Sequence, residues 1–270
     1  MGINIKKSIY IATAFLCLNS CTTPSEKFSR VATELKYRQQ VIDTAIFSHR
    51  VFANTAVEQH KESTTIHVYL DGDGTPWKNN RWLAKDPTSR NPMILRLMQL
   101  DKSPAILLGR PCYHGLNLTS ECASRYWTTH RYSSLVVKSM AMALTQWLKE
   151  REYNQLILIG YSGGGVLAML LASEMPMLQT VVTLAANLDV REWSLYHGYM
   201  PLDDSLNPAA LELNSNIHQL HIAGADDKVV PTYIIEQYAA RQVNASYLLF
   251  PDQNHRCCWT KVWPDILTLF

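Results

Sequence analysis

The chain has 270 residues, of which 47% are hydrophobic and 18% are charged, a balance typical of one globular core and not of a disordered or fibrous protein. Its formal net charge is only +2, which is too small to indicate an electrostatic footprint for nucleic acid. Nucleic acid is therefore not expected as a partner.

The N-terminal segment has the pattern of an export signal. Lys6 and Lys7 precede an apolar run over residues 9–18, which is too short to span a bilayer in the folded protein. The residues Leu18–Cys21 resemble the lipobox of bacterial lipoproteins, and this resemblance implies that Cys21 is acylated after cleavage. An ordinary signal peptide cut at a nearby site is the alternative interpretation.

This pattern predicts three parts of the chain. Residues 1–20 would be a lipoprotein signal peptide, residues 21–27 a short polar tether, and residues 28–270 the globular domain. The protein would be exported and held at the membrane by its lipid anchor, on the outer membrane or the periplasmic face of the cell envelope.

After the tether, apolar runs alternate with amphipathic stretches, which indicates a largely parallel sheet covered by helices on both faces. An early antiparallel strand pair is expected within residues 41–53. The irregular segment 188–208, with three aromatic residues and two prolines, has the length of a cap or lid. The predicted strands are 66–70, 105–108, 156–159, 181–184, 220–223 and 247–250, and the clearest helices are 135–148, 166–175 and 233–240.

Export also changes how the cysteines are interpreted, because an oxidising compartment allows thiols to pair. Four cysteines remain after Cys21, and none has a zinc-like spacing with histidines. We expect a disulfide between Cys112 and Cys122. A bond between Cys257 and Cys258 that restrains the neighbouring loop is a further hypothesis.

The segment Gly160–Gly164 reads Gly-Tyr-Ser-Gly-Gly, and it follows an apolar strand and precedes an amphipathic helix, as a nucleophile turn should. Such a turn exposes the serine, so Ser162 is the candidate nucleophile. The amide of Gly163 would donate to an oxyanion at the helix N-terminus. A phosphate-binding loop is the alternative, but no Lys-Ser or Lys-Thr follows the glycines.

A serine nucleophile needs a histidine base and an acid that orients it. His255 is the favoured base because it lies in a loop directly after the last predicted strand. His218 and His221 fall within a strand, where a packing or surface role is expected. The acid should follow that strand, where Asp226 and Asp227 are adjacent.

At this point the chain resembles the α/β-hydrolase superfamily, whose members carry a Gly-x-x-Asp-x-x-Val-Pro segment like the one at 224–231. The match selects Asp227 as the acid, with Asp226 as fallback. The resemblance also equates the turn at Asp71–Gly74 with the family's His-Gly-x-Gly turn, and so implies the amide of Asp73 as second oxyanion donor. We expect the Asp73 carboxylate to turn outward, away from the oxyanion.

The same aspartates could open a calcium loop, but an EF-hand would require glycine at Pro76 and glutamate at Trp82. No metal and no organic cofactor are therefore expected. Bulky aromatic residues in the loops could line a pocket, but packing is the favoured interpretation; they are Trp77, Trp82, Trp127 and Trp193.

The sequence thus predicts an α/β protein with the α/β-hydrolase fold, a mostly parallel central sheet and a small cap. The expected activity is two-step acyl transfer on a small or medium ester, with Ser162, Asp227 and His255 as the triad. The alternative is an inactive envelope lipoprotein that uses the fold as a binding or scaffolding module, since the fold alone does not fix the function.

Overall fold

The computed structural model describes residues 22–60, 62–79 and 81–270. Cys21, the expected lipid anchor, lies outside these residues. The main strands are β1 (Arg38–Asp43), β2 (Ser48–Ala53), β3 (Thr65–Leu70), β6 (Ala105–Leu108), β7 (Gln155–Tyr161), β8 (Leu178–Leu184), β9 (His218–Gly224) and β10 (Ala245–Phe250). They form one eight-stranded sheet in the order β1-β2-β6-β3-β7-β8-β9-β10.

The sheet is parallel from β6 to β10, and only β1 and β2 run against their neighbours. All six predicted parallel strands and the early antiparallel pair are confirmed, with boundaries shifted by a few residues. The predicted fold class is therefore confirmed. Parallel order brings the carboxyl ends of β3, β7, β9 and β10 to one edge, where loops that carry functional residues can meet.

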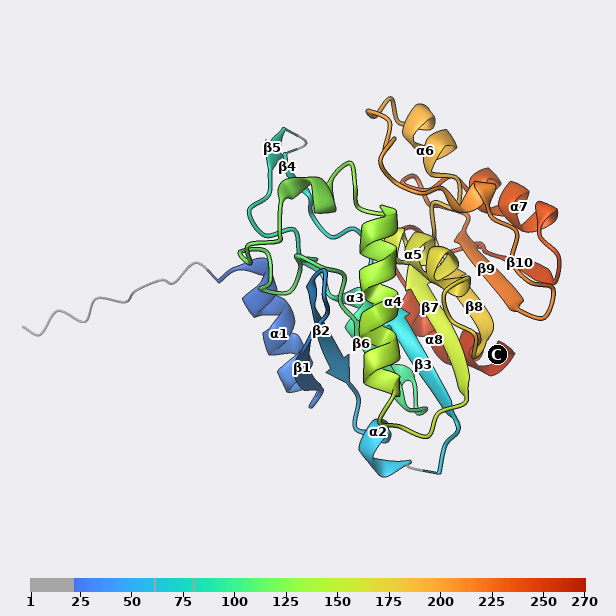
Figure 1. Cartoon of the computed structure of the whole chain (residues 1–270). Helices are drawn as coiled ribbons and strands as arrows, with labels where there is room; N and C mark the ends of the chain where they lie inside the picture. Colours follow the sequence, from blue (N-terminus) through green and yellow to red (C-terminus); the bar gives the residue numbers. More distant parts are fainter. Residues whose placement is uncertain (1–21, 61, 80) are drawn as a thin grey trace, which may run out of the picture.

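Helices cover both faces of the sheet, as Figure 1 shows. One face packs against α4 (Ser134–Leu148), α5 (Gly163–Ala172) and α7 (Thr232–Arg241), and the other against α1 (Pro24–Glu34), α3 (Met93–Leu100) and α8 (Trp259–Ile266). The strand side chains alternate accordingly: Leu156 and Leu158 face the first layer, whereas Ile157 and Ile159 face the second.

Helix α1 corrects the expected tether, because residues 24–27 form its first turn. The Thr23 side chain accepts from the amide of Glu26, and Glu26 caps the Thr23 amide in return. Phe28 and Ala32 are fully buried on one side of the helix. The polar residues of this segment therefore belong to a packed helix, with Glu26 and Lys27 exposed and Ser25 buried.

Two small elements lie beyond the carboxyl edge of the sheet, at the top of Figure 1. One is the hairpin of β4 (Trp77–Lys78) and β5 (Trp82–Leu83), and the other is α6 (Val190–Tyr196), which lies within the expected cap segment. The remaining helices are α2 (Ala56–Gln59) and the short 3-10 turns η1 (Ser124–Trp127), η2 (Pro208–Ala210) and η3 (Leu267–Leu269).

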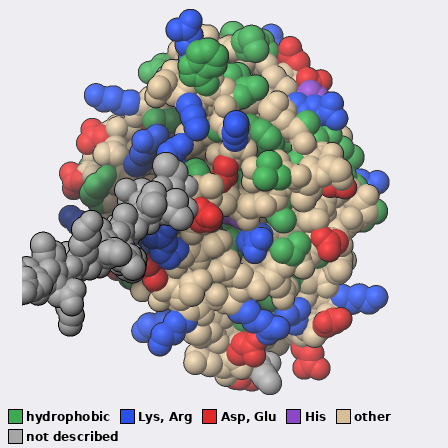
Figure 2. Space-filling view, turned by 90° about the vertical axis from the view of Figure 1, so that its left-hand side faces the viewer, with side chains coloured by type: hydrophobic (Ala, Val, Ile, Leu, Met, Phe, Trp, Pro, Cys, Tyr) green, Lys and Arg blue, Asp and Glu red, His purple; other side chains and the backbone are tan. Residues whose placement is uncertain are grey.

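On the face toward α1 the charge is mixed, since Figure 2 shows Lys and Arg side chains interspersed with Asp and Glu there. None of the helices that the structure describes is both long enough and apolar enough to cross a membrane. The same part of the chain contains no group of three His, Cys, Asp or Glu side chains placed to hold a metal ion.

Candidate active site

Ser162 occupies the turn between β7 and α5 with a backbone φ of 52° and ψ of −126°, a region that non-glycine residues rarely adopt. Two backbone hydrogen bonds hold this conformation: the Ser162 amide donates to the Leu184 carbonyl, and the Ser162 carbonyl accepts from Gly165, both at 2.8 Å. The end of β3 packs closely against the turn, so a Cβ on Gly164 would overlap the carbonyl oxygen of Leu70. The strained serine is therefore fixed by its surroundings.

Ser162, His255 and Asp227 come together although they are far apart in the sequence. Nδ1 of His255 lies 2.8 Å from Oδ2 of Asp227, and Nε2 of His255 lies 3.1 Å from Oγ of Ser162. Because a carboxylate oxygen accepts, Nδ1 donates, which leaves Nε2 to accept from the serine hydroxyl. The imidazole thus lies between hydroxyl and carboxylate.

The second oxygen of Asp227 is also engaged. Its Oδ1 accepts from the amides of Val229 and Val230, each at 2.8 Å. His255 and Asp227 are both 8% exposed, so little water competes for these bonds. The carboxylate is consequently fixed in position before it meets the imidazole. Asp226, the fallback acid, is exposed instead.

The loop that carries His255 is attached on several sides. The Tyr161 hydroxyl, one residue before the serine, donates to the His255 carbonyl at 2.7 Å. Cys257 and Cys258 are bonded to each other, and the side chains of Asn254 and Gln253 accept from their amides. The sequence did not indicate the role of Tyr161, because a residue at this position of the turn has no fixed side-chain partner.

The two amides expected to bind an oxyanion lie next to the serine. The Gly163 amide is the first of α5, where helix N–H groups have no intrahelical partner. The turn that carries Asp73 touches the serine, since a Cβ on Gly72 would lie 3.3 Å from the Ser162 Cβ. Within the described residues, neither the Gly163 nor the Asp73 amide donates to another protein group.

The expectation that the Asp73 carboxylate turns outward is wrong. It points into the protein, where Oδ1 accepts from Arg110 and Oδ2 from Arg131, both at 2.8 Å, and the Tyr132 hydroxyl also donates to it. Burial alone would raise the pKa of Asp73, but the two guanidinium groups outweigh it and lower that pKa to about 2. The Asp73 carboxylate is thus ionised, and the charges of Arg110 and Arg131 balance its negative charge near the oxyanion position.

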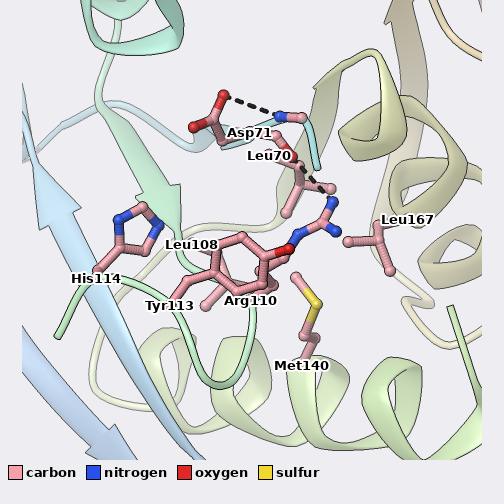
Figure 3. A pocket seen from close by; sticks show the side chains of 9 residues that line it. Leu70, Asp71, Leu108, Arg110, Tyr113, His114, Met140 and Leu167 are labelled. Atoms are coloured by element: carbon pink, nitrogen blue, oxygen red, sulfur yellow. Dashed lines mark hydrogen bonds between the residues drawn. The ribbon is translucent and has the colours of Figure 1, made fainter. Parts of the chain in front are cut away.

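The same clamp holds the backbone around the Asp73 amide. Arg110 also donates to the Asp71 carbonyl at 3.1 Å, and the Tyr113 hydroxyl donates to the Asp73 carbonyl at 3.0 Å. Figure 3 shows Arg110 reaching this turn, with the Asp71 carboxylate folded toward the Gly72 amide. The peptide between Gly72 and Asp73 therefore sits between two fixed carbonyls.

Asp71, which stands where the family turn has histidine, is half-buried. Burial raises its pKa to about 7, against the opposing effects of the Gly72 amide and of Arg110. Asp71 does not join Asp73 around a common point that could bind calcium, because the Asp73 carboxylate is occupied by the two arginines.

The remaining predicted residues take structural positions. Cys112 and Cys122 form a disulfide with an S–S distance of 2.04 Å. His221 is buried, with Nδ1 2.8 Å from the Thr183 hydroxyl, and His218 is exposed at the start of β9.

Sequence reasoning missed Arg110 and Arg131. Arg110 follows β6, the neighbour of β3 in the sheet, so the strand order was the one signal that could have placed it near Asp73. Arg131 lies in an irregular loop without such a signal.

Comparison with known proteins identifies the family and the fold. The sequence model of the serine hydrolase (FSH1) family matches residues 114–258. Among solved structures, the esterase Pf2001 of Pyrococcus furiosus has a TM-score of 0.57 at 13% identity, with 92% of each chain covered. Est1E of Butyrivibrio proteoclasticus has a TM-score of 0.57 at 12% identity, covering 86% of this chain and 98% of Est1E. No curated protein sequence matches the chain.

Proposed function

The chain belongs to the serine hydrolase (FSH1) family, and from this premise we propose that it hydrolyses small or medium carboxylic esters or related acyl substrates. The observation that carries the proposal is the hydrogen-bonded series Asp227, His255 and Ser162, with distances of 2.8 and 3.1 Å. The name of one structural neighbour, the esterase Pf2001, favours esters among the possible acyl substrates.

In the proposed first step, Oγ of Ser162 attacks the ester carbonyl carbon while Nε2 of His255 takes the hydroxyl proton. Asp227 holds the Nδ1–H tautomer and stabilises the imidazolium that forms. His255 then gives the proton to the leaving alcohol, and an acyl-enzyme remains on the serine. Water attacks the acyl-enzyme by the same proton path and releases the acid.

The tetrahedral intermediate carries a negative oxygen that needs fixed donors. The amides of Gly163 and Asp73 are free to donate, and the dipole of α5 adds positive potential at Gly163. The pairing of the Asp73 carboxylate with Arg110 and Arg131 removes the repulsion that an unpaired acid would exert on the oxyanion. No step in this scheme uses a cofactor.

Hydrolysis of aryl acetates by the purified chain tests the function. We expect wild-type turnover that falls by about 10⁶-fold in Ser162→Ala and in His255→Gln, because the triad acts as a unit. Ser120→Ala, at an exposed serine in a surface loop, is the matched control and should retain full activity. A folded wild type that cleaves no ester would instead favour the binding or scaffolding module.

We also propose that the protein is exported and anchored in the membrane through an acylated Cys21. A disulfide between Cys112 and Cys122 fits an oxidising compartment. Because α1 starts at Pro24, such an anchor would hold the hydrolase body close to the bilayer. Metabolic labelling with a palmitate analogue should mark the wild type and not Cys21→Ser, and equal labelling of both would contradict the anchor.

A further inference from the structure

A cavity of about 440 Å³ lies between the cap and the loops of the main domain, a size in the range of small-ligand sites. Three segments form it: Pro76 and Trp77 at the β4–β5 hairpin, the loop Thr128–Arg131, and the cap from Trp193 to Leu202. We refer to it as the cap pocket. Trp77 and Trp193 line this pocket, which is the less favoured of the two roles that the sequence left open for them.

A wall residue of the cap pocket bonds to a residue beside the nucleophile turn. Arg131 lines it and donates through Nη1 to the Asp73 carboxylate. That carboxylate lies directly over Gly163, where an added Cβ would overlap Oδ1 of Asp73. Arg131 is therefore separated from the residue next to Ser162 by one carboxylate.

The pocket is also connected to the acid loop. Nε1 of Trp193 and Nε2 of His197 each donate to the Val229 carbonyl at 2.7 Å. The amide of Val229 in turn donates to the Asp227 carboxylate. Two wall residues of the pocket thus bond to the surroundings of the site, Arg131 to Asp73 and Trp193 to the acid loop. From these bonds we infer that the pocket can hold one arm of an ester bound at Ser162.

The walls of the pocket are mainly apolar. Trp77, Tyr199 and Met200 are 40%, 53% and 73% exposed, so their surfaces are available to a ligand. Trp and Tyr faces favour flat groups, and the flexible Met thioether adapts to their edges. Among the residues that the structure describes, no acidic side chain lines the pocket.

Arg131 supplies the polar contact. It is only 8% exposed, its Nε donates to the Thr128 carbonyl and its Nη1 to Asp73. Its Nη2 makes no hydrogen bond to the described part of the chain. Arg110 and Arg131 share one carboxylate, which leaves this cluster with a net positive charge that an anionic oxygen would balance.

Building on the proposed hydrolase function, we propose that the cap pocket binds an ester arm with a flat apolar body and a carboxylate. The body would lie among Trp77, Trp193 and Tyr199, and the carboxylate would accept from Nη2 of Arg131. Aryl esters that carry an acid group on the ring are the simplest substrates of this class.

Binding without catalysis tests the pocket separately from the hydrolase function. Calorimetry on the full chain carrying Ser162→Ala would measure 4-methylbenzoate as the probe. We expect binding that weakens by about tenfold or more when Arg131→Gln is added, because a charge-assisted hydrogen bond is lost. Adding Tyr196→Ala, an exposed residue of α6 that does not line the pocket, should leave the affinity unchanged.

Kinetics then test the class of substrate. The ratio of kcat/KM for 4-acetoxybenzoate to that for neutral 4-acetoxybenzamide should exceed one in wild type and fall toward one in Arg131→Gln. The ratio cancels any general loss that the variant causes through Asp73. Trp77→Ala should lower kcat/KM for both aryl esters, because the aromatic wall that holds the ring is lost.

The inference would be overturned by 4-methylbenzoate binding that is indifferent to Arg131→Gln, or by a wild type that does not distinguish the acid from the amide. Hydrolysis of ethyl acetate without binding of 4-methylbenzoate would refute the proposal for the cap pocket and leave the hydrolase function standing. Benzoate binding without any ester hydrolysis would refute the catalytic proposal alone.

Discussion

Replacing Gly163 by alanine tests how closely the nucleophile turn depends on the Asp73 clamp. An added Cβ would overlap Oδ1 of Asp73 and lie 2.5 Å from the Tyr132 hydroxyl oxygen, well inside ordinary van der Waals contact. The carboxylate would have to move away from Arg110 and Arg131, which bind it at 2.8 Å. The substitution therefore strains both oxyanion donors at once.

Two opposing effects decide whether Gly163→Ala raises or lowers the free energy of unfolding. Alanine is favoured over glycine inside a helix by about 1 kcal/mol, which would stabilise the variant. Loss of a single hydrogen bond to a charged group costs about 1.5–3 kcal/mol, and three donors hold Asp73. We expect Gly163→Ala to lower the free energy of unfolding by about 2–4 kcal/mol.

Urea unfolding and ester kinetics measure both consequences. Displacement of an oxyanion donor should lower kcat by about 10²–10³-fold. Gly115→Ala is the matched control, because Gly115 has a φ of +87° but no heavy atom closer than 3.9 Å to its added Cβ. It should lose only about 1–2 kcal/mol and no activity. If Gly163→Ala were as stable and active as wild type, the close contact between Gly163 and the clamped Asp73 carboxylate would be refuted.

Three further predictions concern the surroundings of the site. The raised pKa of Asp71, about 7, means that the folded state holds a proton which the unfolded state has released, so this group lowers stability as pH rises from about 4 to 7. Urea melts should show the stability of Asp71→Asn gaining on wild type over that range, and a constant difference would contradict the shift. Tyr113→Phe removes the donor to the Asp73 carbonyl and should lower kcat by about two- to tenfold with KM unchanged; an effect on KM alone would argue against positioning. Loss of the disulfide in Cys112→Ser with Cys122→Ser should lower the free energy of unfolding by about 2–4 kcal/mol, whereas calorimetry showing an unchanged Tm would mean that the bond does not constrain the unfolded chain.

The sequence was sufficient to predict the strands and the triad, because for these a local residue pattern and a general rule of parallel sheets indicate the same result. The strands of the sheet are short apolar runs, and buried parallel strands require such runs on both faces. Ser162, Asp227 and His255 each follow a predicted strand, so the parallel order of β7, β9 and β10 is enough to bring them to one edge.

The parts that were missed depend on long-range contacts. Helix α1 has the polar composition of a tether, and only Phe28 and Ala32 show which side packs. The strands β4 and β5 have two residues each, too few to show periodicity. The orientation of Asp73 depends on Arg110 and Arg131, which lie 37 and 58 residues away.

The most direct measurement of the central claim is the site of covalent modification by a fluorophosphonate, mapped by mass spectrometry on peptides of the full chain. We predict one adduct on the peptide that spans Gly160–Gly164, located on Ser162, and no adduct in Ser162→Ala. An adduct on a different residue, or an unmodified folded protein, would contradict the assignment of Ser162 as the nucleophile.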